Sequence, residues 1–164
     1  MKVGVIGYGG LGQIGTRDAV LAGAEVHVAE TKESVWDLAR AAGVADVVRD
    51  ASEWAGQGFD LVVDYAGFDT TQKAVDAVKR GTGTVVQVGL GLPTFTIQSA
   101  SILGKTLVGS LGGTVQDIEE VCGLLLDREI EPAYTDIAFE EIGAGLERLR
   151  RNEVSGRLVA RFGD

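Results

Sequence analysis

The feature that most constrains the fold is a glycine-rich turn placed directly after a short apolar run at the start of the chain. The stretch reads VGVIGYGGLG over residues 3–12, and Gly7, Gly9 and Gly12 give it the spacing G-x-G-x-x-G. An apolar run of this length predicts a buried strand, and the residues after the turn have the apolar spacing of a helix. A strand that enters a helix through such a turn is typical of a dinucleotide-binding βαβ unit.

Each glycine of this turn has its own physical role. Gly7 permits the tight turn, Gly9 lets a pyrophosphate approach the backbone, and Gly12 allows the helix to pack closely on the strand. The helix N-terminus then presents free N–H groups and a partial positive charge to phosphates. Gly10 makes the motif G-x-G-G-x-G. Because a chain with 24 glycines produces such a pattern by chance, its position between a strand and a helix carries more weight than its letters.

The second predicted strand ends at an acidic residue, Glu30, which lies 18 residues beyond Gly12. A carboxylate at this place accepts hydrogen bonds from both hydroxyls of an adenosine ribose and repels a 2′-phosphate, which favours NAD over NADP. The alternative interpretation is a solvated side chain at the end of a strand. Lys32 follows two residues later, and its positive charge is close enough to soften the discrimination against NADP.

Short apolar runs rich in β-forming residues alternate with amphipathic helical stretches along most of the chain. This alternation, with short glycine-bearing loops, predicts an α/β fold with a doubly wound, six-stranded parallel sheet, a Rossmann fold, over residues 1–131. Residues 132–164 are read as a C-terminal strand–helix–strand appendage. The expected strands cover residues 2–6, 25–29, 46–48, 61–64, 84–88, 106–110 and 157–162, and the expected helices cover 11–22, 33–42, 70–80 and 115–127, with a further helix in the appendage.

Charge and composition narrow the function classes. A net charge of −9 argues against a nucleic-acid partner, because the phosphate backbone would be repelled. No run approaches the roughly 18 apolar residues of a membrane span, so we expect no membrane association. The lack of a signal peptide and of disulfides points to a cytoplasmic location. One cysteine, Cys122, and one histidine, His27, exclude an internal disulfide and a Cys/His zinc site within these 164 residues.

Several residues with reactive side chains are interpreted as structural. His27 lies within a strand and is expected to be a packed or edge histidine. Cys122 is expected on the inward face of a helix, as a core thiol beside Val121 and Leu125. Asp64 is expected to order a loop rather than to act as a general base. No combination gives a nucleophile with its base, so no catalytic residue and no metal ligand is predicted.

From residue 2 to residue 162 the chain resembles the coenzyme-binding domain of the medium-chain dehydrogenase/reductase superfamily, and it is most similar to the zinc-dependent alcohol dehydrogenases. The resemblance rests on segments that occur in order and at the spacing of the family. They are VIGYGGLG, AGAEVHVAE, FDLVVDYAG, GTVVQVGLG, LVGSLGG and GLERLRRNEVSGRLVARF. The resemblance implies a domain that binds NAD(H) and orients it for hydride transfer between an alcohol and a carbonyl compound.

In that family a GroES-like catalytic domain precedes the first of these segments and supplies the zinc ligands. The resemblance therefore implies that zinc belongs to that domain, that this chain is a fragment of an oxidoreductase, and that it is inactive alone. The substrate, a small alcohol or carbonyl compound, is not identified by these residues. Two alternatives stay open: a domain of a zinc-free quinone or enoyl reductase, and a non-catalytic regulatory module that senses NAD(H).

The resemblance also implies which residues contact the cofactor. The turn at Gly9, Gly10 and Leu11 holds the pyrophosphate, and Arg157 matches a tail arginine that reaches it in some members. Further contacts follow the later strands. After the fourth strand, Ala66 and Gly67 line the coenzyme cleft. After the fifth strand, Val88, Gly89 and Leu90 lie beside the nicotinamide and its ribose, and after the sixth strand Ser110 and Leu111 meet the carboxamide. One departure is Val35, where many members carry a lysine or arginine near the adenosine ribose.

Family members often dimerise by joining edge strands near the sixth strand. The segment of residues 93–110, PTFTIQSASILGKTLVGS, is rich in β-forming residues. An exposed sheet edge invites strand pairing with another chain. We therefore expect a homodimer through this edge.

Overall fold

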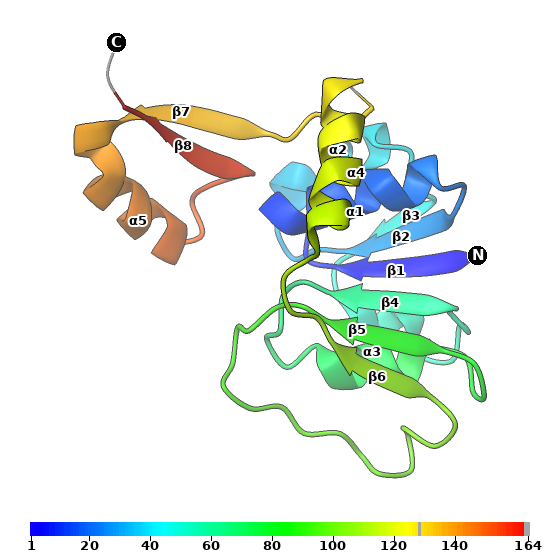
Figure 1. Cartoon of the computed structure of the whole chain (residues 1–164). Coiled ribbons are helices and arrows are strands. Elements are labelled where there is room, and N and C mark those ends of the chain that lie inside the picture. Colours follow the sequence, from blue (N-terminus) through cyan, green and yellow to red (C-terminus); the bar gives the residue numbers. More distant parts are fainter. Residues whose placement is uncertain (128, 163–164) are drawn as a thin grey trace.

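A six-stranded parallel sheet forms the centre of the molecule (Figure 1). The computed structural model describes residues 1–127 and 129–162. The strand order is β3-β2-β1-β4-β5-β6, and every neighbouring pair is parallel. The strands are β1 (Lys2–Ile6), β2 (Glu25–Ala29), β3 (Asp46–Val48), β4 (Leu61–Asp64), β5 (Thr84–Gln87) and β6 (Thr106–Gly109). The predicted doubly wound Rossmann sheet is therefore confirmed.

Helices cover both faces of this sheet and bury a separate apolar core on each. The α-helices of this part of the chain are α1 (Gly10–Leu21), α2 (Trp36–Ala41), α3 (Thr71–Ala77) and α4 (Val115–Leu126). The 3-10 helix η1 (Glu33–Val35) directly precedes α2, and the 3-10 helix η2 (Ala51–Trp54) follows β3. Val3 and Val5 of β1 pack with α1 and α2, whereas Ile6 packs with α3 and η2. Successive side chains of a strand point to opposite faces, so each residue of this apolar run is buried.

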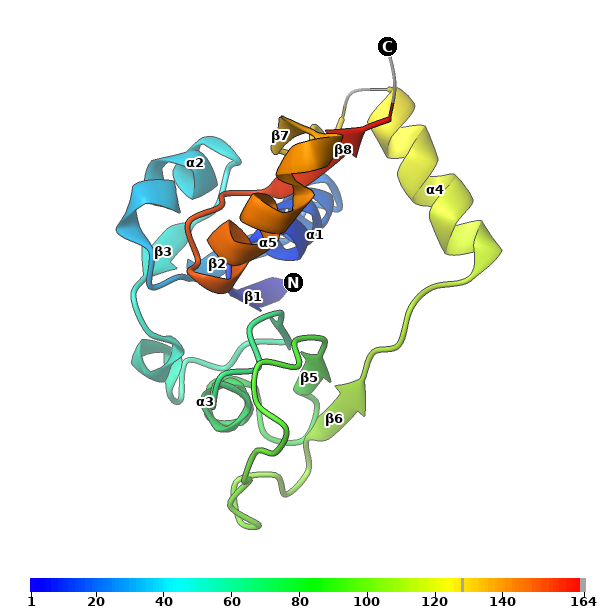
Figure 2. The same ribbon diagram turned by 90° about the vertical axis from the view of Figure 1, so that its left-hand side faces the viewer.

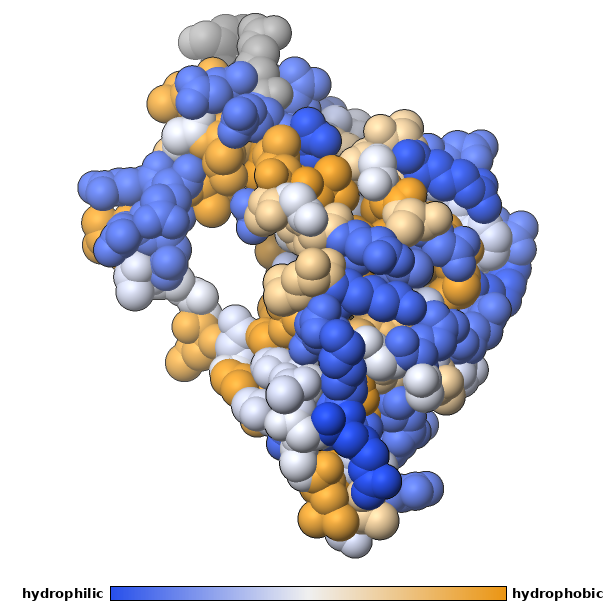
Figure 3. All heavy atoms as spheres, turned by 90° about the vertical axis from the view of Figure 1, so that its right-hand side faces the viewer, coloured by the Kyte–Doolittle hydropathy of each residue, from blue (hydrophilic) through white to orange (hydrophobic). Residues whose placement is uncertain are grey.

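Helix α4 lies apart from the sheet, which was not predicted. Figure 2 shows α4 separated from the strands, and the space-filling view shows an open gap through the molecule (Figure 3). None of its residues is buried; Val115 is 73% exposed and Ile118 is 60% exposed. Cys122 is exposed as well, so the prediction of a core thiol is wrong. The helix and its apolar face were expected, but the sheet does not cover that face.

The C-terminal segment is a small parallel βαβ unit. It consists of β7 (Tyr134–Ala138), the 3-10 helix η3 (Phe139–Glu141), α5 (Ile142–Arg150) and β8 (Arg157–Arg161), and β7 pairs with β8 in a sheet of its own. The expected strand–helix–strand order is therefore present, and the division of the chain at residue 131 stays a prediction.

In the part of the chain that the structure describes, no helix has the length and apolarity needed to cross a membrane.

Candidate functional site

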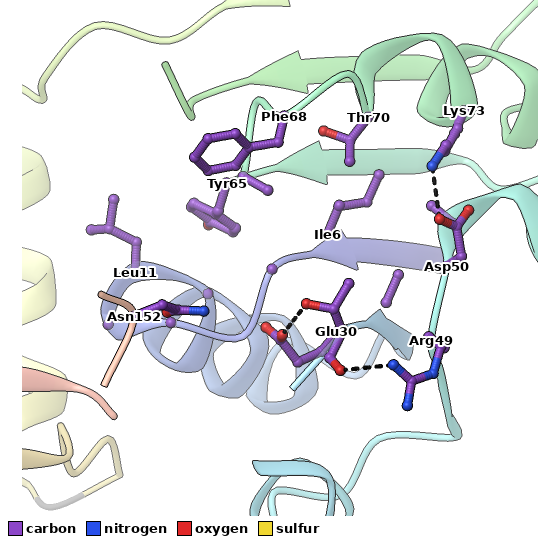
Figure 4. A pocket seen from close by; sticks show the side chains of 18 of the residues that line it. Ile6, Leu11, Glu30, Arg49, Asp50, Tyr65, Phe68, Thr70, Lys73 and Asn152 are labelled. Atoms are coloured by element: carbon purple, nitrogen blue, oxygen red, sulfur yellow. Dashed lines mark hydrogen bonds and ion pairs between the residues drawn. The ribbon is translucent and has the colours of Figure 1, made fainter. Parts of the chain in front are cut away.

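The candidate site is a pocket at the carboxyl ends of β1, β2 and β4. Its volume is about 580 Å³. The strand order reverses between β1 and β4, and ligands of open α/β sheets bind at such a switch point. Figure 4 shows the pocket from close by. It is lined by Ile6, Gly7, Gly9, Gly10, Leu11, Gly12, Ala29, Glu30, Thr31, Arg49, Asp50, Ala51, Tyr65, Ala66, Phe68, Thr70, Lys73, Asn152 and Arg157.

The glycine turn forms one wall of this pocket. Gly7 has a φ of +89°, a conformation that L side chains rarely adopt. A Cβ at Gly12 would lie 1.9 Å from the carbonyl oxygen of Gly7, so the helix starts in direct contact with the turn. A Cβ at Gly9 would meet no atom within 4 Å. The turn is therefore packed closely at Gly12 and open toward the pocket at Gly9.

The first turn of α1 presents backbone N–H groups that no side chain caps. Gly9 is the N-cap residue of α1, and it has no side chain with which to accept a hydrogen bond from them. Unsatisfied N–H groups and the helix dipole make such a terminus a favourable place for an anion. This end of α1 opens into the pocket, since Gly9, Gly10 and Leu11 all line it.

Glu30, which follows β2, is held in the pocket by two short hydrogen bonds. Its Oε2 accepts from the backbone N–H of Tyr8 at 2.7 Å, and its Oε1 accepts from the backbone N–H of Lys32 at 2.7 Å. Oε1 also accepts from the Thr31 hydroxyl at 3.3 Å. The carboxylate thus ties the glycine turn to the end of β2. The sequence predicted the place of this carboxylate and did not predict its contact with the turn.

Arg157, the first residue of β8, reaches the same turn from the far end of the chain. A Cβ at Gly10 would lie 2.6 Å from its Nε, so the guanidinium group lies directly over the start of α1. Both residues line the pocket. The cationic side chain of Arg157 therefore stands beside the uncapped helix N-terminus.

The opposite wall carries an ion pair that was not predicted. Lys73 of α3 donates to Asp50 Oδ2 at 2.7 Å (Figure 4). The backbone N–H of Ser52 donates to Asp50 Oδ1 at 2.8 Å. Hydrogen bonds from the Lys73 ammonium group and from Ser52 together lower the pKa of Asp50 to about 2, and Lys73 has the larger effect. Asp50 follows β3, and residues that follow parallel strands share one edge of a sheet. That rule is the signal that identifies this residue from sequence.

Asp64 orders the loop that follows β4. This buried carboxylate accepts from the backbone N–H groups of Ala66 and Gly67 at 3.0 Å each, and from the hydroxyl of Thr70 at 2.7 Å. The Thr71 hydroxyl lies 3.2 Å from Oδ2, but it has a closer acceptor in Gln87 Oε1 at 2.6 Å. The bonds to Ala66, Gly67 and Thr70 give Asp64 the loop-ordering role that was expected of it. The loop in turn places Ala66 and Thr70 in the pocket wall.

The remaining predicted contact residues lie at the same sheet edge but outside the pocket lining. Gly67 and Gly89 are in close backbone contact, since a Cβ at Gly67 would lie 2.3 Å from the Gly89 carbonyl oxygen. The N–H groups of Val88 and Gly89 both donate to the Asp64 carbonyl oxygen at 2.9 Å. Leu90 and Leu111 are 91% and 100% exposed, and the N–H of Ser110 donates to the Gln87 carbonyl oxygen at 2.9 Å. The structure brings Gly7, Gly9, Gly10, Leu11, Gly12, Glu30, Ala66 and Arg157 together in one pocket and leaves Gly67, Val88, Gly89, Leu90, Ser110 and Leu111 outside it.

Two residues near Glu30, Val35 and Lys32, lie outside the pocket lining. Val35 is 6% exposed and packs in the core beneath α1 and α2. The Lys32 ammonium group reaches the carbonyl oxygens of Asn152 and Val154.

His27 packs edge-on against the Phe59 ring, with the two ring centroids 5.2 Å apart, so it is a packed histidine. Among the described residues, no three His, Cys, Asp or Glu side chains gather in a way that suits a metal ion.

Comparison with known proteins gives a consistent result. A family model described as zinc-binding dehydrogenase matches residues 10–127. Aldehyde reductase YahK of Escherichia coli is 28% identical over 96% of this chain and 47% of its own length. The chain spans about half the length of the curated relatives it matches.

Solved structures of dehydrogenases and reductases share the fold. Acetophenone reductase from Geotrichum candidum, solved in complex with NAD, superposes with a TM-score of 0.91 and 31% identity, over 97% of this chain and 48% of that one. The alcohol dehydrogenase of Aeropyrum pernix superposes with a TM-score of 0.84 and 27% identity, over 96% of this chain and 48% of that one.

Proposed function

This chain belongs to the zinc-binding dehydrogenase family, and on that premise we propose that it binds NAD(H) in the pocket at the carboxyl edge of its sheet. The complete protein is then an alcohol dehydrogenase-type oxidoreductase that acts on a small alcohol or carbonyl compound. The nicotinamide ring supplies the hydride acceptor or donor when the cofactor is bound. The role of this chain is to bind the dinucleotide and orient its reactive ring.

The observation that carries the proposal is the position of Glu30 beside the glycine turn. Its carboxylate lies in the pocket, within 2.7 Å of the Tyr8 nitrogen, and Oε2 retains a lone pair beyond the one backbone bond that it accepts. A ribose hydroxyl is a donor that suits this lone pair, and a 2′-phosphate is repelled by the negative charge. Lys32 does not offset that repulsion in this arrangement, because its ammonium group contacts the carbonyl oxygens of residues 152 and 154. This arrangement favours NAD over NADP.

The pyrophosphate is assigned to the space in front of Gly9. That space is free of protein atoms within 4 Å of a Cβ built at Gly9, and it adjoins the uncapped N–H groups of α1. Arg157 stands over Gly10 and supplies a cation for the same group. A helix N-terminus with an adjacent guanidinium group matches both the charge and the hydrogen-bonding of a pyrophosphate.

The nicotinamide half is assigned to the loops after β4, β5 and β6. Gly67, Val88, Gly89, Leu90, Ser110 and Leu111 follow these strands at the same sheet edge as the pocket. The described residues offer no donor set for zinc, so no step through zinc is assigned to this chain.

A homodimer through β6 is part of the proposal. Within the described residues β6 pairs only with β5, and Val108 is 45% exposed. A free edge presents unpaired N–H and C=O groups to another chain. Sedimentation equilibrium is expected to give twice the chain mass, and a monomer at all concentrations would contradict this part.

The experiment that tests the function is a calorimetric titration with NADH and with NADPH. The unmodified chain is expected to bind NADH more tightly. Glu30→Ala is expected to weaken NADH binding about tenfold, as for loss of hydrogen bonds to a charged acceptor, and to reduce the preference over NADPH. Glu30→Gln keeps an acceptor oxygen without the charge, so it is expected to restore part of the NADH affinity and none of the discrimination.

Glu119→Ala serves as the control, because this glutamate is exposed on α4 and lies outside the pocket lining. Circular dichroism establishes that each variant is folded. Absence of NADH binding by the folded, unmodified chain would refute the proposal. Unchanged selectivity in both Glu30 variants would refute the role of the carboxylate.

A further inference from the structure

Lys32 contacts the C-terminal unit rather than the ribose position. Its Nζ lies 3.3 Å from the carbonyl oxygen of Asn152 and 3.4 Å from that of Val154. Its backbone N–H donates to Glu30 Oε1 at 2.7 Å, so the residue is anchored to a carboxylate that lines the pocket. The side chain thus connects the end of β2 to a segment 120 residues further along the chain.

The segment that Lys32 contacts is the loop between α5 and β8. Asn152 lines the pocket and has a φ of +56°, which turns the chain sharply after α5. The carbonyl oxygens of Asn152 and Val154 lie in the loop beyond the end of α5 at Arg150, outside the hydrogen-bond ladder of the helix. An ammonium group donates to such carbonyl oxygens, which is the physical reason for this contact.

The same loop leads directly to Arg157. Three residues after Val154 the chain enters β8 with Arg157, whose guanidinium group lies over Gly10. The backbone N–H of Arg157 donates to the Ala133 carbonyl oxygen at 2.9 Å, which joins it to the strand partner β7. The position of the arginine therefore depends on where the loop of residues 152–156 is held.

We propose that Lys32 is a positioning residue that holds this loop against the end of β2 and so keeps Arg157 over the phosphate-binding turn. Its effect on ligand binding rests on the proposed function, because the group that Arg157 contacts is the pyrophosphate of a dinucleotide. The contact itself is a property of the ligand-free chain. Lys32 does not line the pocket, so it acts through Arg157 rather than on the ligand.

The first test needs no ligand. Hydrogen exchange of the amides of residues 152–157 is compared in the unmodified chain, Lys32→Met, Lys32→Arg and Arg80→Met. Lys32→Met is expected to exchange several-fold faster there, and Lys32→Arg, which retains donors for both carbonyl oxygens, is expected to restore slow exchange. Arg80→Met removes one positive charge from an exposed position after α3 and is expected to change nothing in this loop.

The second test is a double-mutant cycle on NADH affinity. Lys32→Met is expected to raise the Kd about fivefold in the unmodified background and less than twofold in the Arg157→Met background, because Lys32 acts through that arginine. A fivefold loss in both backgrounds would mean that the lysine charge attracts the ligand directly, which would overturn the proposal.

Failure of the proposed function is recognised separately. If the folded, unmodified chain does not bind NADH, the exchange experiment alone decides the role of Lys32. Exchange of residues 152–157 that is equal in the unmodified chain and in Lys32→Met would overturn the proposal whatever the ligand result.

Discussion

Two glycine substitutions in one turn are expected to separate stability from ligand binding. Gly12→Ala places a Cβ 1.9 Å from the Gly7 carbonyl oxygen, and both are backbone-anchored, so α1 or the turn must move. Overpacking of this kind costs about 3 kcal/mol, and for a chain of this size it lowers the Tm by about 6–12 °C. Gly12→Ala is therefore expected to be destabilised, whatever the ligand.

Gly9→Ala is expected to behave in the opposite way. Its Cβ meets no protein atom within 4 Å, and its φ of −82° is accessible to alanine. Alanine also restricts the unfolded chain, which contributes about 0.4–1 kcal/mol in favour of the folded state. The Tm is expected to be unchanged or slightly higher. The added methyl group nevertheless occupies the space assigned to the pyrophosphate, so NADH affinity is expected to fall at least tenfold, about 1.4 kcal/mol.

The assay pairs thermal unfolding with calorimetric NADH titration for the unmodified chain and both variants. A Gly9→Ala variant that unfolds as early as Gly12→Ala would refute the claim that the turn is open at this point. A stable Gly9→Ala variant that binds NADH with unchanged affinity would refute the assignment of the pyrophosphate. Normal stability of Gly12→Ala would contradict the close contact between helix and turn.

Two further predictions concern carboxylates near the pocket. Hydrogen bonds from the Lys73 ammonium group and from Ser52 lower the pKa of Asp50 from 3.8 to about 2, so these contacts stabilise the fold above about pH 4 and their contribution is lost as the pH falls toward 2. After discounting for solvent exposure, the contribution is about 1 kcal/mol. Between pH 5 and pH 2, the free energy of unfolding in urea is therefore expected to fall by about 1 kcal/mol more in the unmodified chain than in Asp50→Asn. An equal decrease in both proteins would contradict this prediction. Asp64→Ala leaves the buried N–H of Gly67 without its acceptor, so the free energy of unfolding is expected to fall by about 3 kcal/mol, and a loss below about 1 kcal/mol by denaturant titration would show that the loop orders itself without Asp64.

Much of the fold was predictable because local patterns determine it. The predicted strands agree with β1, β2, β3 and β4 at both ends, since an apolar run bounded by glycine or charged residues has one reasonable length. The glycine turn was predictable for the same reason. Its three spaced glycines have local steric causes, visible in the positive φ of Gly7 and the contact at Gly12.

What sequence did not predict depends on contacts between distant segments. Cys122 lies on an apolar helix face, and periodicity describes that face without describing what covers it. Lys32 was placed near the ribose because it is close to Glu30 in sequence, whereas its side chain turns toward Asn152. Asp50 follows β3 and Lys73 lies in α3, and only the folded arrangement brings Lys73 Nζ within 2.7 Å of Asp50 Oδ2.

The pocket has a consequence for synthesis of the chain, because its lining runs from Ile6 to Arg157. On a translating ribosome the six strands of the central sheet emerge well before β8, so a nascent chain forms most of the fold while the site still lacks its arginine. A ligand stabilises only the states that bind it. Under the proposed function, the dinucleotide therefore stabilises chains whose translation has passed Arg157 more than those that stopped earlier.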